Sequence, residues 1–596
     1  MGNRQPGATA RERGVGSTGS IYRGPGCIRK PSEHRPTPAV ASTTVDPPAP
    51  IPSSGPDDGH RPSAVRLDRA LDDLSDAQRR AVDSPSLALS IVAGAGSGKT
   101  RVLTLRAARR IRDGSADADH TVVCTFTRKA AHELRDRLAH FDVPVSTPAG
   151  PGGIPTPGVR AGTLHQLALT LLRRRALDTD QAPPALVEHR WRTLVDLVAD
   201  RSLASTVDTE IGWAKARCLS PDTYTAAASA AERSVALPFD QVTEVFTDYQ
   251  ERLGRRGLLD LDDVLLRAAD LLLDDATFAE QAHWRYRHLA VDEFQDVNPA
   301  QFRLILAVIG QRADICAVGD PNQAIYGWNG ADWGLLGSLP DVIPGLEVVH
   351  LDTNHRCSPQ VVAAAAAALG PVVVAPPRSA LPDGPVPTLT SFDDDRAEAE
   401  AVTTAILTRT ESGTPWSDQA VLARTHEQLA TIRRSLEAAG VPCRFAPAPE
   451  SPTADTAPTA LGRPGRATRP AAGPGAVLSE PGGGVELATF HRAKGLEWAA
   501  VNVVGLEAGF VPIIHATTPE TLAEERRLLY VALTRAGQIL ECSWARSRTM
   551  GGGRAMERRP SPWLSELADM CEAGDTVAAH RDTASRFADL RANLKR

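Results

Sequence analysis

The sequence predicts an α/β fold with two parallel-sheet lobes and a helical insertion in the first lobe. From residue 87 onward, short apolar runs alternate with helical patterns, which is typical of buried parallel strands joined by helical crossovers. The runs form two series along the chain, and two series indicate two lobes. Within the first series, about 174–258 lacks strand signals and is expected to be a helical insertion.

The apolar runs define the extent of each lobe. In the first lobe, expected over 67–346, the strands are 87–92, 121–126, 288–292 and 314–318. In the second lobe, expected over 347–445 and 485–564, they are 347–351, 420–423, 485–489, 500–504 and 538–542. Large aromatic side chains are expected to pack the core of the insertion: Trp191, Trp213, Tyr224, Phe246 and Tyr249.

Three further segments are expected to lie outside the lobes. Residues 1–66 hold 11 prolines, 9 glycines and one aromatic residue, which is too little apolar surface to offset chain entropy, so we expect a disordered tail. A partner-binding or DNA-contacting tail is the functional alternative. Residues 446–484 are rich in proline and glycine and are expected to be a flexible linker. Residues 565–596 are expected to form a C-terminal tail.

The composition narrows the class of protein. The 596-residue chain has no stretch near the ~20 apolar residues of a membrane span and no apolar signal-peptide core, so we expect no membrane partner. Its eight cysteines form no C-x-x-C pair, which argues against zinc sites and disulfides and favours a reducing cytoplasm. The net charge of −6 gives no overall signal for nucleic acid, although a local basic groove can suffice.

A glycine-rich loop follows the first expected strand. It reads Ala93, Gly94, Ala95, Gly96, Ser97, Gly98, Lys99 and Thr100, and a helical pattern comes after it. The glycines let backbone N–H groups face a polyphosphate, while the lysine reaches the β- and γ-phosphates and the threonine hydroxyl binds Mg²⁺. The loop therefore predicts a nucleoside triphosphate, which we take to be ATP, together with Mg²⁺.

Two acidic residues end a later strand of the same lobe. Asp292 and Glu293 follow the apolar run that ends at Val291. At the carboxyl end of a strand in an open sheet, Asp292 is expected to hold Mg²⁺, and Glu293 to orient and deprotonate the attacking water. The alternative is a solvated acidic strand end, which the upstream phosphate loop makes the weaker interpretation.

A turn with a glutamine and two aromatic residues follows the next strand. Gln323 is a candidate sensor of the γ-phosphate, and Tyr326 and Trp328 are candidates for stacking on nucleic-acid bases. Packing in a core is the alternative for either ring taken alone. This segment would link a nucleotide to a nucleic acid within a few residues.

Together these motifs resemble those of superfamily 1A DNA helicases of the UvrD/PcrA/Rep type, over about residues 71–564 apart from the linker. The resemblance implies two RecA-like lobes of a P-loop NTPase with ATP between them. The nucleotide contacts it implies are Gln78 and Arg101 at adenine, Gly495 and Glu497 in a later motif, and Arg356 and Arg535 at the γ-phosphate. His355 stands where the family has a tyrosine on adenine.

The same resemblance implies a path for single-stranded DNA. Its further contacts are Phe126, Thr163, His165 and His491. Arginines from a facing lobe can stabilise charge on the γ-phosphoryl oxygens only when the cleft closes, so hydrolysis is coupled to lobe movement. For Arg526 and Arg527, which precede Arg535, we expect surface positions that are solvated or in weak salt bridges.

Two departures from the family pattern bear on function. Asn329 stands where the family has an arginine after the stacking tryptophan, which removes a cation near DNA. Relatives carry a large helical subdomain that contacts duplex where this chain has the linker at 446–484. We therefore expect a motor that translocates and needs a partner to unwind efficiently.

The sequence thus predicts an ATP-dependent single-stranded DNA translocase or helicase that acts in repair or replication in the cytoplasm. Its expected partners are single-stranded DNA, single/double-strand junctions and a repair protein, and 3′→5′ polarity follows from the resemblance alone. The alternative is an accessory motor ATPase that unwinds DNA or displaces proteins only with a partner subunit. A nucleotide-gated switch is least favoured, because Phe126, Tyr326 and Trp328 would then lack a role.

Overall fold

The computed structural model describes residues 62–147, 156–187, 189–198, 200–233, 235–370, 375–446, 483–549 and 554–574. The chain divides into two units, Met1–Gly59 and His60–Arg596, and every described residue belongs to the second. The expected tail lies outside the described residues up to position 61, and the expected linker does so from 447 to 482. Helix α1 (Pro62–Asp72) begins inside the expected tail, so regular structure starts before the predicted boundary at 67.

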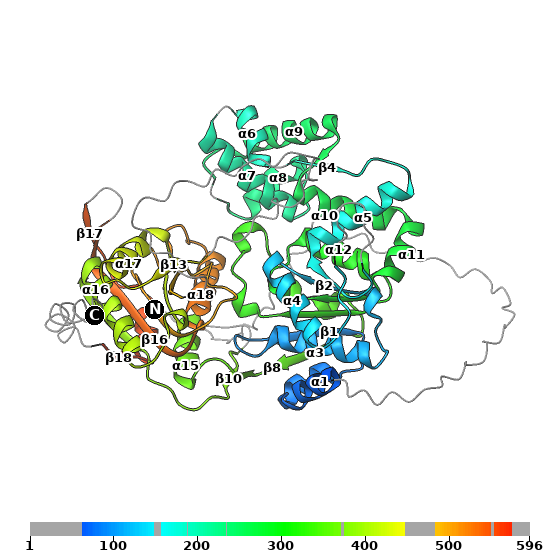
Figure 1. Ribbon diagram of the computed structural model, residues 1–596. Coiled ribbons are helices and arrows are strands. Elements are labelled where there is room, and N and C mark those ends of the chain that lie inside the picture. The colour runs from blue at the N-terminus through cyan, green and yellow to red at the C-terminus, as the bar shows by residue number, and fades with distance from the viewer. Residues whose placement is uncertain are drawn as a thin grey trace, which may run out of the picture. The chain divides into compact units, whose positions relative to one another are not determined.

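The first lobe is built on a six-stranded parallel sheet (Figure 1). In spatial order its strands are β3 (Arg160–Thr163), β2 (Thr121–Thr125), β6 (His288–Val291), β7 (Ile315–Gly319), β1 (Ala88–Ala93) and β8 (Glu347–Leu351). Every neighbouring pair in this sheet is parallel. The loops that follow the strands therefore meet at one edge of the sheet, where ligands bind in open α/β folds.

Helices cover both faces of this sheet. One face carries α1, α2 (Asp76–Asp83), α3 (Lys99–Arg112) and α4 (Arg128–His140), and the other carries α5 (Leu164–Asp178), α10 (Leu261–Asp274), α11 (Ala276–Arg285) and α12 (Pro299–Ile309). Alternate strand residues serve alternate faces, since Val122 and Cys124 pack with the second group and Val123 with the first. Burial on both faces explains why the strands read as unbroken apolar runs.

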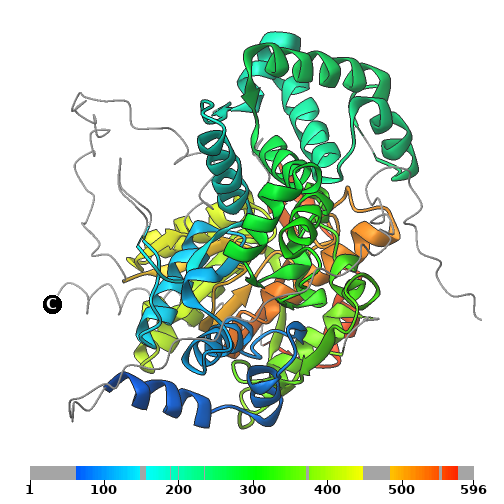
Figure 2. The ribbon, with the colours of Figure 1, turned by 90° about the vertical axis from the view of Figure 1, so that its right-hand side faces the viewer.

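The helical insertion has a core of its own, separate from the first sheet in both views (Figures 1 and 2). It consists of α6 (Arg190–Val198), α7 (Arg201–Ala216), α8 (Pro221–Ala230) and α9 (Phe239–Arg256). Four of the five expected aromatic residues are buried there, whereas Trp191 is 36% exposed and does not join that core. The chain enters and leaves through the short parallel pair β4 (Ala185–Leu186) and β5 (Leu258–Leu259), which the sequence did not indicate.

A buried lysine ties the insertion to the first lobe. Lys215 of α7 donates hydrogen bonds from Nζ to Asp260 Oδ2 at 2.7 Å and to Asp263 Oδ1 at 2.8 Å. The Tyr249 hydroxyl also donates to Asp260, at 3.0 Å. Burial alone would raise the pKa of Asp260, but Lys215 and Arg190 outweigh burial and lower it. The charges are therefore mutually satisfied at the base of α10.

The second lobe is built on an eight-stranded sheet. Along it lie β13 (Cys443–Phe445), β14 (Val485–Thr489), β12 (Gln419–Ala423), β15 (Trp498–Val503), β16 (Ala536–Thr549), β11 (Thr388–Asp394) and β18 (Glu572–Ala573), all parallel, while β17 (Ala555–Glu557) pairs antiparallel with β16. One face carries α15 (Pro359–Leu369), α18 (Pro519–Leu533) and α19 (Leu564–Ala568), and the other carries α16 (Asp395–Glu411) and α17 (His426–Ala438). Two parallel sheets, each covered on both faces, confirm the predicted fold class.

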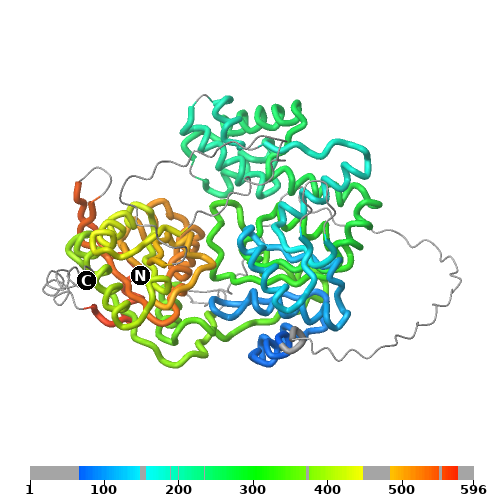
Figure 3. The backbone as a smooth tube through the Cα atoms, viewed as in Figure 1, coloured from blue at the N-terminus to red at the C-terminus, as the bar shows by residue number. Residues whose placement is uncertain are grey.

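Short elements connect the two sheets. They include the two-stranded pair of β9 (Thr353–Asn354) with β10 (Arg378–Ser379), whereas α13 (Gly334–Gly337) and α14 (Leu339–Val342) lie between β7 and β8 of the first sheet. Single 3₁₀ turns are η1 (Ala118–His120), η2 (Phe294–Asp296), η3 (Pro321–Gln323), η4 (Gly327–Asn329) and η5 (Trp416–Asp418). Figure 3 lets the reader follow the backbone from β8 through this region into the second lobe. No helix in the described ranges is both long enough and apolar enough to cross a membrane.

Three sequence-based boundaries need correction. Strand 347–351 pairs with β1, so it closes the first sheet and does not open the second lobe. The run 388–394, whose only apolar residues are Leu389 and Phe392, forms β11 and was missed as a strand because it lacks an apolar run. The expected C-terminal tail contains β18, which pairs with β11 at 572–573. Sheet membership depends on which strand lies alongside, and local sequence does not encode that.

A buried arginine organises the second lobe. Arg548 of β16 donates from Nη2 to Glu398 Oε2 and to Glu507 Oε1, both at 2.6 Å. The Arg548 side chain is 3% exposed and both carboxylate side chains are fully buried. Ser543 also donates to Glu398 Oε1, at 2.6 Å, which completes a network joining α16, β16 and the segment after β15. Removing the cation would leave two buried carboxylates without their counter-charge.

We therefore expect Arg548→Met to destabilise the second lobe by about 3–5 kcal/mol. Urea denaturation followed by circular dichroism measures this loss. The control is Arg546→Met on the same strand, because Arg546 is 59% exposed and its partner Asp393 is 75% exposed. An exposed pair contributes at most about 1 kcal/mol. Equal losses in the two variants would contradict the importance of the buried network.

Candidate functional site

The glycine-rich loop joins β1 to α3. Gly96 and Gly98 have φ angles of 69° and 81°, in the left-handed region that favours glycine. A Cβ atom at Gly96 would also collide with the side-chain amide of Asn354. Lys99 Nζ lies 3.3 Å from the Ala93 carbonyl and 3.7 Å from Asp320 Oδ2. The ammonium group is thus held between the carboxyl ends of β1 and β7.

The hydroxyl and carboxylate expected at Mg²⁺ lie together. Thr100 Oγ1 donates a hydrogen bond to Asp292 Oδ2 at 3.0 Å. Burial and the neighbouring charge of Glu293 raise the pKa of Asp292 to about 7. Among the described residues, no group of three or more His, Cys, Asp or Glu could hold a metal by itself. These two oxygens suit Mg²⁺, which commonly takes one or two protein carboxylates and completes its shell with phosphate oxygens and water.

Glu293 adopts an unusual backbone conformation at the end of β6. Its φ is 54°, which is uncommon for a residue with a side chain. Its Oε2 accepts a hydrogen bond from Gln295 Nε2 at 2.5 Å, and this fixes the carboxylate. Burial would raise its pKa, but Lys99 and Lys494 reverse that effect and lower it. The group is therefore held ionised, as a base must be.

Hydrogen bonds link Glu293 to the loop after β7. Gln295 Oε1 accepts from the Asp320 backbone N–H at 2.9 Å. Asp320 Oδ2 in turn accepts from Gln323 Nε2 at 2.6 Å. The candidate base and the candidate sensor are thus joined through Gln295 and Asp320. Sequence reasoning missed both of these residues, although each belongs to a motif that it recognised.

Two arginines of the second lobe reach this network. Arg535 is 2% exposed, and its Nη2 donates to Gln323 Oε1 at 3.4 Å. Burial, together with the like charge of Arg356, lowers the pKa of Arg535 to about 10. Arg356 lies 2.6 Å from Glu497 through Nε and donates to the Thr534 carbonyl at 3.3 Å. Arg535 therefore contacts Gln323 directly, while Arg356 lies near Arg535 and pairs with Glu497.

The residues expected at adenine surround the start of α3. Gln78 Nε2 donates to the Ser97 carbonyl at 2.9 Å, and Ser75 caps the helix that carries Gln78. Arg101 donates to the Ala70 carbonyl at 3.2 Å. His355 is exposed, and its backbone N–H donates to the Gly96 carbonyl at 2.8 Å. Partial burial and the charge of Arg101 lower the pKa of the His355 ring.

The two remaining residues of the expected nucleotide motif lie in the second lobe. Gly495 has a φ of 84°, and the Glu497 side chain is 64% exposed. Glu497 contacts Arg356, so its carboxylate is engaged within its own lobe. Their expected contact with the nucleotide is untested and stays a prediction.

A lysine that sequence reasoning had not singled out for the site joins the two lobes. Lys494 Nζ donates to Asp296 Oδ2 at 2.6 Å and to the Gln323 carbonyl at 2.7 Å. It also lies 5.0 Å from the centre of the Tyr326 ring. Burial raises the pKa of Asp296 to about 7 even with Lys494 beside it. One ammonium group thus contacts the acidic segment after β6, the turn that carries Gln323, and the ring of Tyr326, a candidate for stacking on DNA bases.

Candidate DNA contacts form two groups. Tyr326 and His491 lie with ring centres 6.4 Å apart, and Trp328 is 55% exposed nearby in sequence. Phe126 follows β2 and packs in part against the first core. Thr163 is the last residue of β3, and its hydroxyl caps α5 by accepting from the Gln166 N–H at 3.2 Å. Both groups lie after carboxyl strand ends, which is the edge expected for ligands.

His165, the other expected contact with the DNA backbone, is partly buried. Burial lowers the pKa of its ring, and Asp262 and Asp260 partly counter that effect. The histidine therefore lies beside the charged cluster that holds the insertion on the lobe. Its contact with a sugar–phosphate backbone remains a prediction.

The expectation of a solvated or salt-bridged surface position holds for Arg526, which pairs with Glu566, but is wrong for Arg527. Arg527 Nε donates to the Ala324 carbonyl at 2.8 Å, and burial lowers its pKa. Arg526 is engaged with Glu566 at 2.7 Å and 2.8 Å. Glu524 of the same helix accepts from the Gly327 N–H at 3.1 Å. Helix α18 is therefore docked on the turn that carries Tyr326 and Trp328.

Comparisons with known proteins agree with this geometry. The family described as the UvrD/REP helicase N-terminal domain matches residues 74–342, and the UvrD-like helicase C-terminal domain matches residues 477–547. The ATP-dependent DNA helicase UvrD2 of Mycobacterium tuberculosis is 34% identical over 87% of this chain and 85% of its own length.

Two other relatives match over shorter regions. DNA helicase II of Escherichia coli is 30% identical over 63% of this chain and 51% of its own length. The ATP-dependent DNA helicase PcrA of Staphylococcus epidermidis is 27% identical over the same shares of each chain. This chain therefore spans about half the length of these two relatives.

We predict a distinctive acid sensitivity from His491. Burial, with Arg424 and Lys494, lowers the pKa of its ring from 6.5 to about 4. Between these values the unfolded chain binds a proton that the folded chain does not, so stability falls as the pH falls through this window. His491→Gln should therefore lose less stability than the wild type between about pH 7 and pH 5, as measured by urea denaturation. The exposed His140→Gln serves as the control and should follow the wild type.

Proposed function

Since this chain belongs to the UvrD/REP family of superfamily 1A DNA helicases, we propose that it is an ATP-driven motor that moves along single-stranded DNA in the 3′→5′ direction. The observation that carries the proposal is the meeting of both lobes around Glu293. The charges of Lys99 from the first lobe and of Lys494 and Arg535 from the second all act to lower the pKa of its carboxyl group. A site assembled from two lobes can change when they move.

The residues at the glycine-rich loop would bind the nucleotide. Loop N–H groups and Lys99 take the phosphates, and Thr100 with Asp292 would hold Mg²⁺, which supplies charge neutralisation at the phosphate oxygens. Gln78 lies at the loop through its bond to Ser97, and Arg101 and His355 lie at the same end. We assign adenine to this end.

Glu293 would orient and deprotonate the attacking water. Its ionised state and its bond to Gln295 suit that role. Arg535 and Arg356 would stabilise the charge that develops on the γ-phosphoryl oxygens. Arg535 already lies against Gln323, so loss of the γ-phosphate would be felt at the same hydrogen bond.

Movement on DNA would follow from the contacts of Lys494. Because the same ammonium group touches the sensor turn and the Tyr326 ring, a change at the nucleotide can shift a base-stacking surface. The exposed Trp328 and partly buried Phe126 provide further rings for bases. DNA repair or replication in the cytoplasm is the setting we propose.

An accessory motor that unwinds only with a partner is the second candidate. Strands β13 and β14 are neighbours in the second sheet, and the Pro/Gly-rich segment 446–484 lies between them in sequence. That segment is short for a subdomain that contacts duplex. A repair protein would then supply the missing duplex contact.

ATP hydrolysis tests the assignment of the base and the phosphate-binding lysine. We expect Glu293→Gln to bind ATP but to lose about 10²–10⁴-fold in turnover, because the general base is removed. Lys99→Ala should abolish the ATPase activity. Wild type should be stimulated by single-stranded DNA more than by duplex or RNA. The exposed Glu133→Gln is the matched control, and normal turnover by Glu293→Gln would remove the proposed base.

Translocation and unwinding assays separate the two candidates. A stopped-flow assay on single-stranded DNA should show movement by the isolated chain. A strand-displacement assay under the same conditions should show weak unwinding that a partner protein increases. Vigorous unwinding by the chain alone would refute the need for a partner, and absence of translocation would refute the motor.

A further inference from the structure

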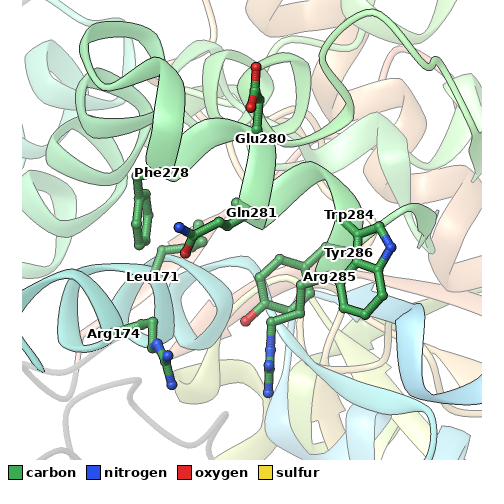
Figure 4. A pocket seen from close by; sticks show the side chains of 9 residues that line it. Leu171, Arg174, Phe278, Glu280, Gln281, Trp284, Arg285 and Tyr286 are labelled. Atoms are coloured by element: carbon green, nitrogen blue, oxygen red, sulfur yellow. The ribbon is translucent and has the colours of Figure 1, made fainter. Parts of the chain in front are cut away.

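A pocket lies on the first lobe, away from the residues described above. It has a volume of about 450 Å³, which falls in the range of ligand sites. Side chains from α5 and from α11 with the residues after it line it, and Figure 4 shows them. They are Leu171, Arg174, Phe278, Glu280, Gln281, Ala282, Trp284, Arg285 and Tyr286. None of these residues has a role in the proposed motor.

The pocket lies at the opposite edge of the sheet from the motor site. Trp284, Arg285 and Tyr286 come just before β6 begins, and Arg160, which contacts the Tyr286 ring, is the first residue of β3. The motor residues follow the carboxyl ends of these same parallel strands. A molecule bound at the pocket would therefore leave the nucleotide and DNA edge free.

The walls of the pocket are apolar and aromatic. Leu171 and Phe278 face it from the two helices (Figure 4). Trp284 is 57% exposed and its ring is fixed by His120, with ring centres 4.1 Å apart. Tyr286, the tyrosine of the pocket, is only 4% exposed, whereas tryptophan and arginine, the residue types exposed here, often dominate binding energy at protein interfaces.

Positive charge gathers at one rim. The guanidinium groups of Arg174 and Arg285 extend to the same side, whereas Glu280 points away (Figure 4). Arg174 is paired with Asp178 at 2.9 Å, but no carboxylate in the described ranges forms an ion pair with Arg285. Burial and the positive charge of Arg285 lower the pKa of Arg160, so the two cations lie close enough to repel. A bound carboxylate would relieve this repulsion.

We propose that this pocket binds an acidic peptide segment of a partner protein, with a large apolar side chain in the pocket and carboxylates on Arg285 and Arg160. The aromatic walls favour an apolar side chain in the pocket, and the guanidinium groups of Arg285 and Arg160 favour carboxylates beside it. This inference goes beyond the motor function and does not depend on it.

Nucleic acid fits the rim less well than a peptide. Acidic side chains alternate with the arginines, since Asp178 holds Arg174 and Asp117 lies 3.3 Å from Arg287. A continuous phosphate chain would meet these carboxylates, whereas a short acidic segment needs only Arg285, which forms no ion pair within the described ranges, and its neighbour Arg160. The pocket also offers depth for one side chain and lacks an extended row of rings for successive bases.

Fluorescence anisotropy with a labelled peptide tests the proposal on the full chain. The probe contains three acidic residues followed by glycine, leucine and phenylalanine. We expect saturable binding that weakens by about tenfold or more in Arg285→Glu and in Trp284→Ala. Binding should also fall when the probe carries amides in place of its carboxylates, or alanines in place of its leucine and phenylalanine.

Matched controls separate this site from general effects. Arg255→Glu and Trp191→Ala change an exposed arginine and a partly exposed tryptophan on the insertion, and neither should alter peptide binding. DNA-stimulated ATPase activity should be unchanged in Arg285→Glu and Trp284→Ala, which shows that they fold and that the site is separate.

Three outcomes would overturn the proposal. The first is equal peptide binding by wild type and both pocket variants, or no binding by wild type. The second is displacement of the peptide by a single-stranded oligonucleotide, which would assign the face to nucleic acid. The third is dimerisation of the chain that Arg285→Glu abolishes in sedimentation experiments, which would assign the face to a second copy.

Discussion

The contacts of Lys494 are the constraint on which the candidate site depends. The Lys494 side chain is 9% exposed, and its ammonium group bridges Asp296 and the Gln323 carbonyl while it lies over the Tyr326 ring. A lysine can be taken out of water only with such compensation. Because the lysine belongs to one lobe and its partners to the other, the charge compensation requires the lobes to be together. Nucleotide chemistry and the candidate DNA surface therefore share one interaction.

The parallel strands give the first sheet two distinct edges, one at the carboxyl ends of the strands and one at their amino ends. The glycine-rich loop, the pair Asp292–Glu293 and the turn with Gln323 all lie at the carboxyl ends of the strands, because every strand of this sheet runs in the same direction. Amino ends collect the pocket between α5 and α11, with Trp284 and Arg285 at its rim. A partner on the second edge could stay attached while the first edge works. The buried charges of Lys215 and Arg548 add hydrogen-bonded ion pairs within the two lobes, the first at the base of the insertion and the second across α16 and β16.

Much of the fold and site could be read from local sequence. The strand runs, the glycine-rich loop and the pair Asp292–Glu293 were identified because each has a direct local signal. Each strand is buried on both faces and so reads as an unbroken apolar run, which explains why the α/β class was evident. Strand 347–351 was assigned to the wrong lobe because its neighbour β1 lies far away in sequence. Arg527 was expected in solvent because helical sequence gives no sign that Ala324 would lie beside it.

Residue chemistry and spacing established that this chain handles a nucleoside triphosphate, since glycines, Lys99 and acidic strand ends have that meaning wherever they fold together. Tertiary structure decided which residues become ion-pair or hydrogen-bond partners. Lys494 with Asp296, and Gln295 with Asp320, became partners only when separate strands and lobes met. Burial also shifted the ionisation of individual groups, because it raises the pKa of Asp296 and lowers the pKa of His491. Such effects depend on distance and desolvation in three dimensions, and a linear sequence carries neither.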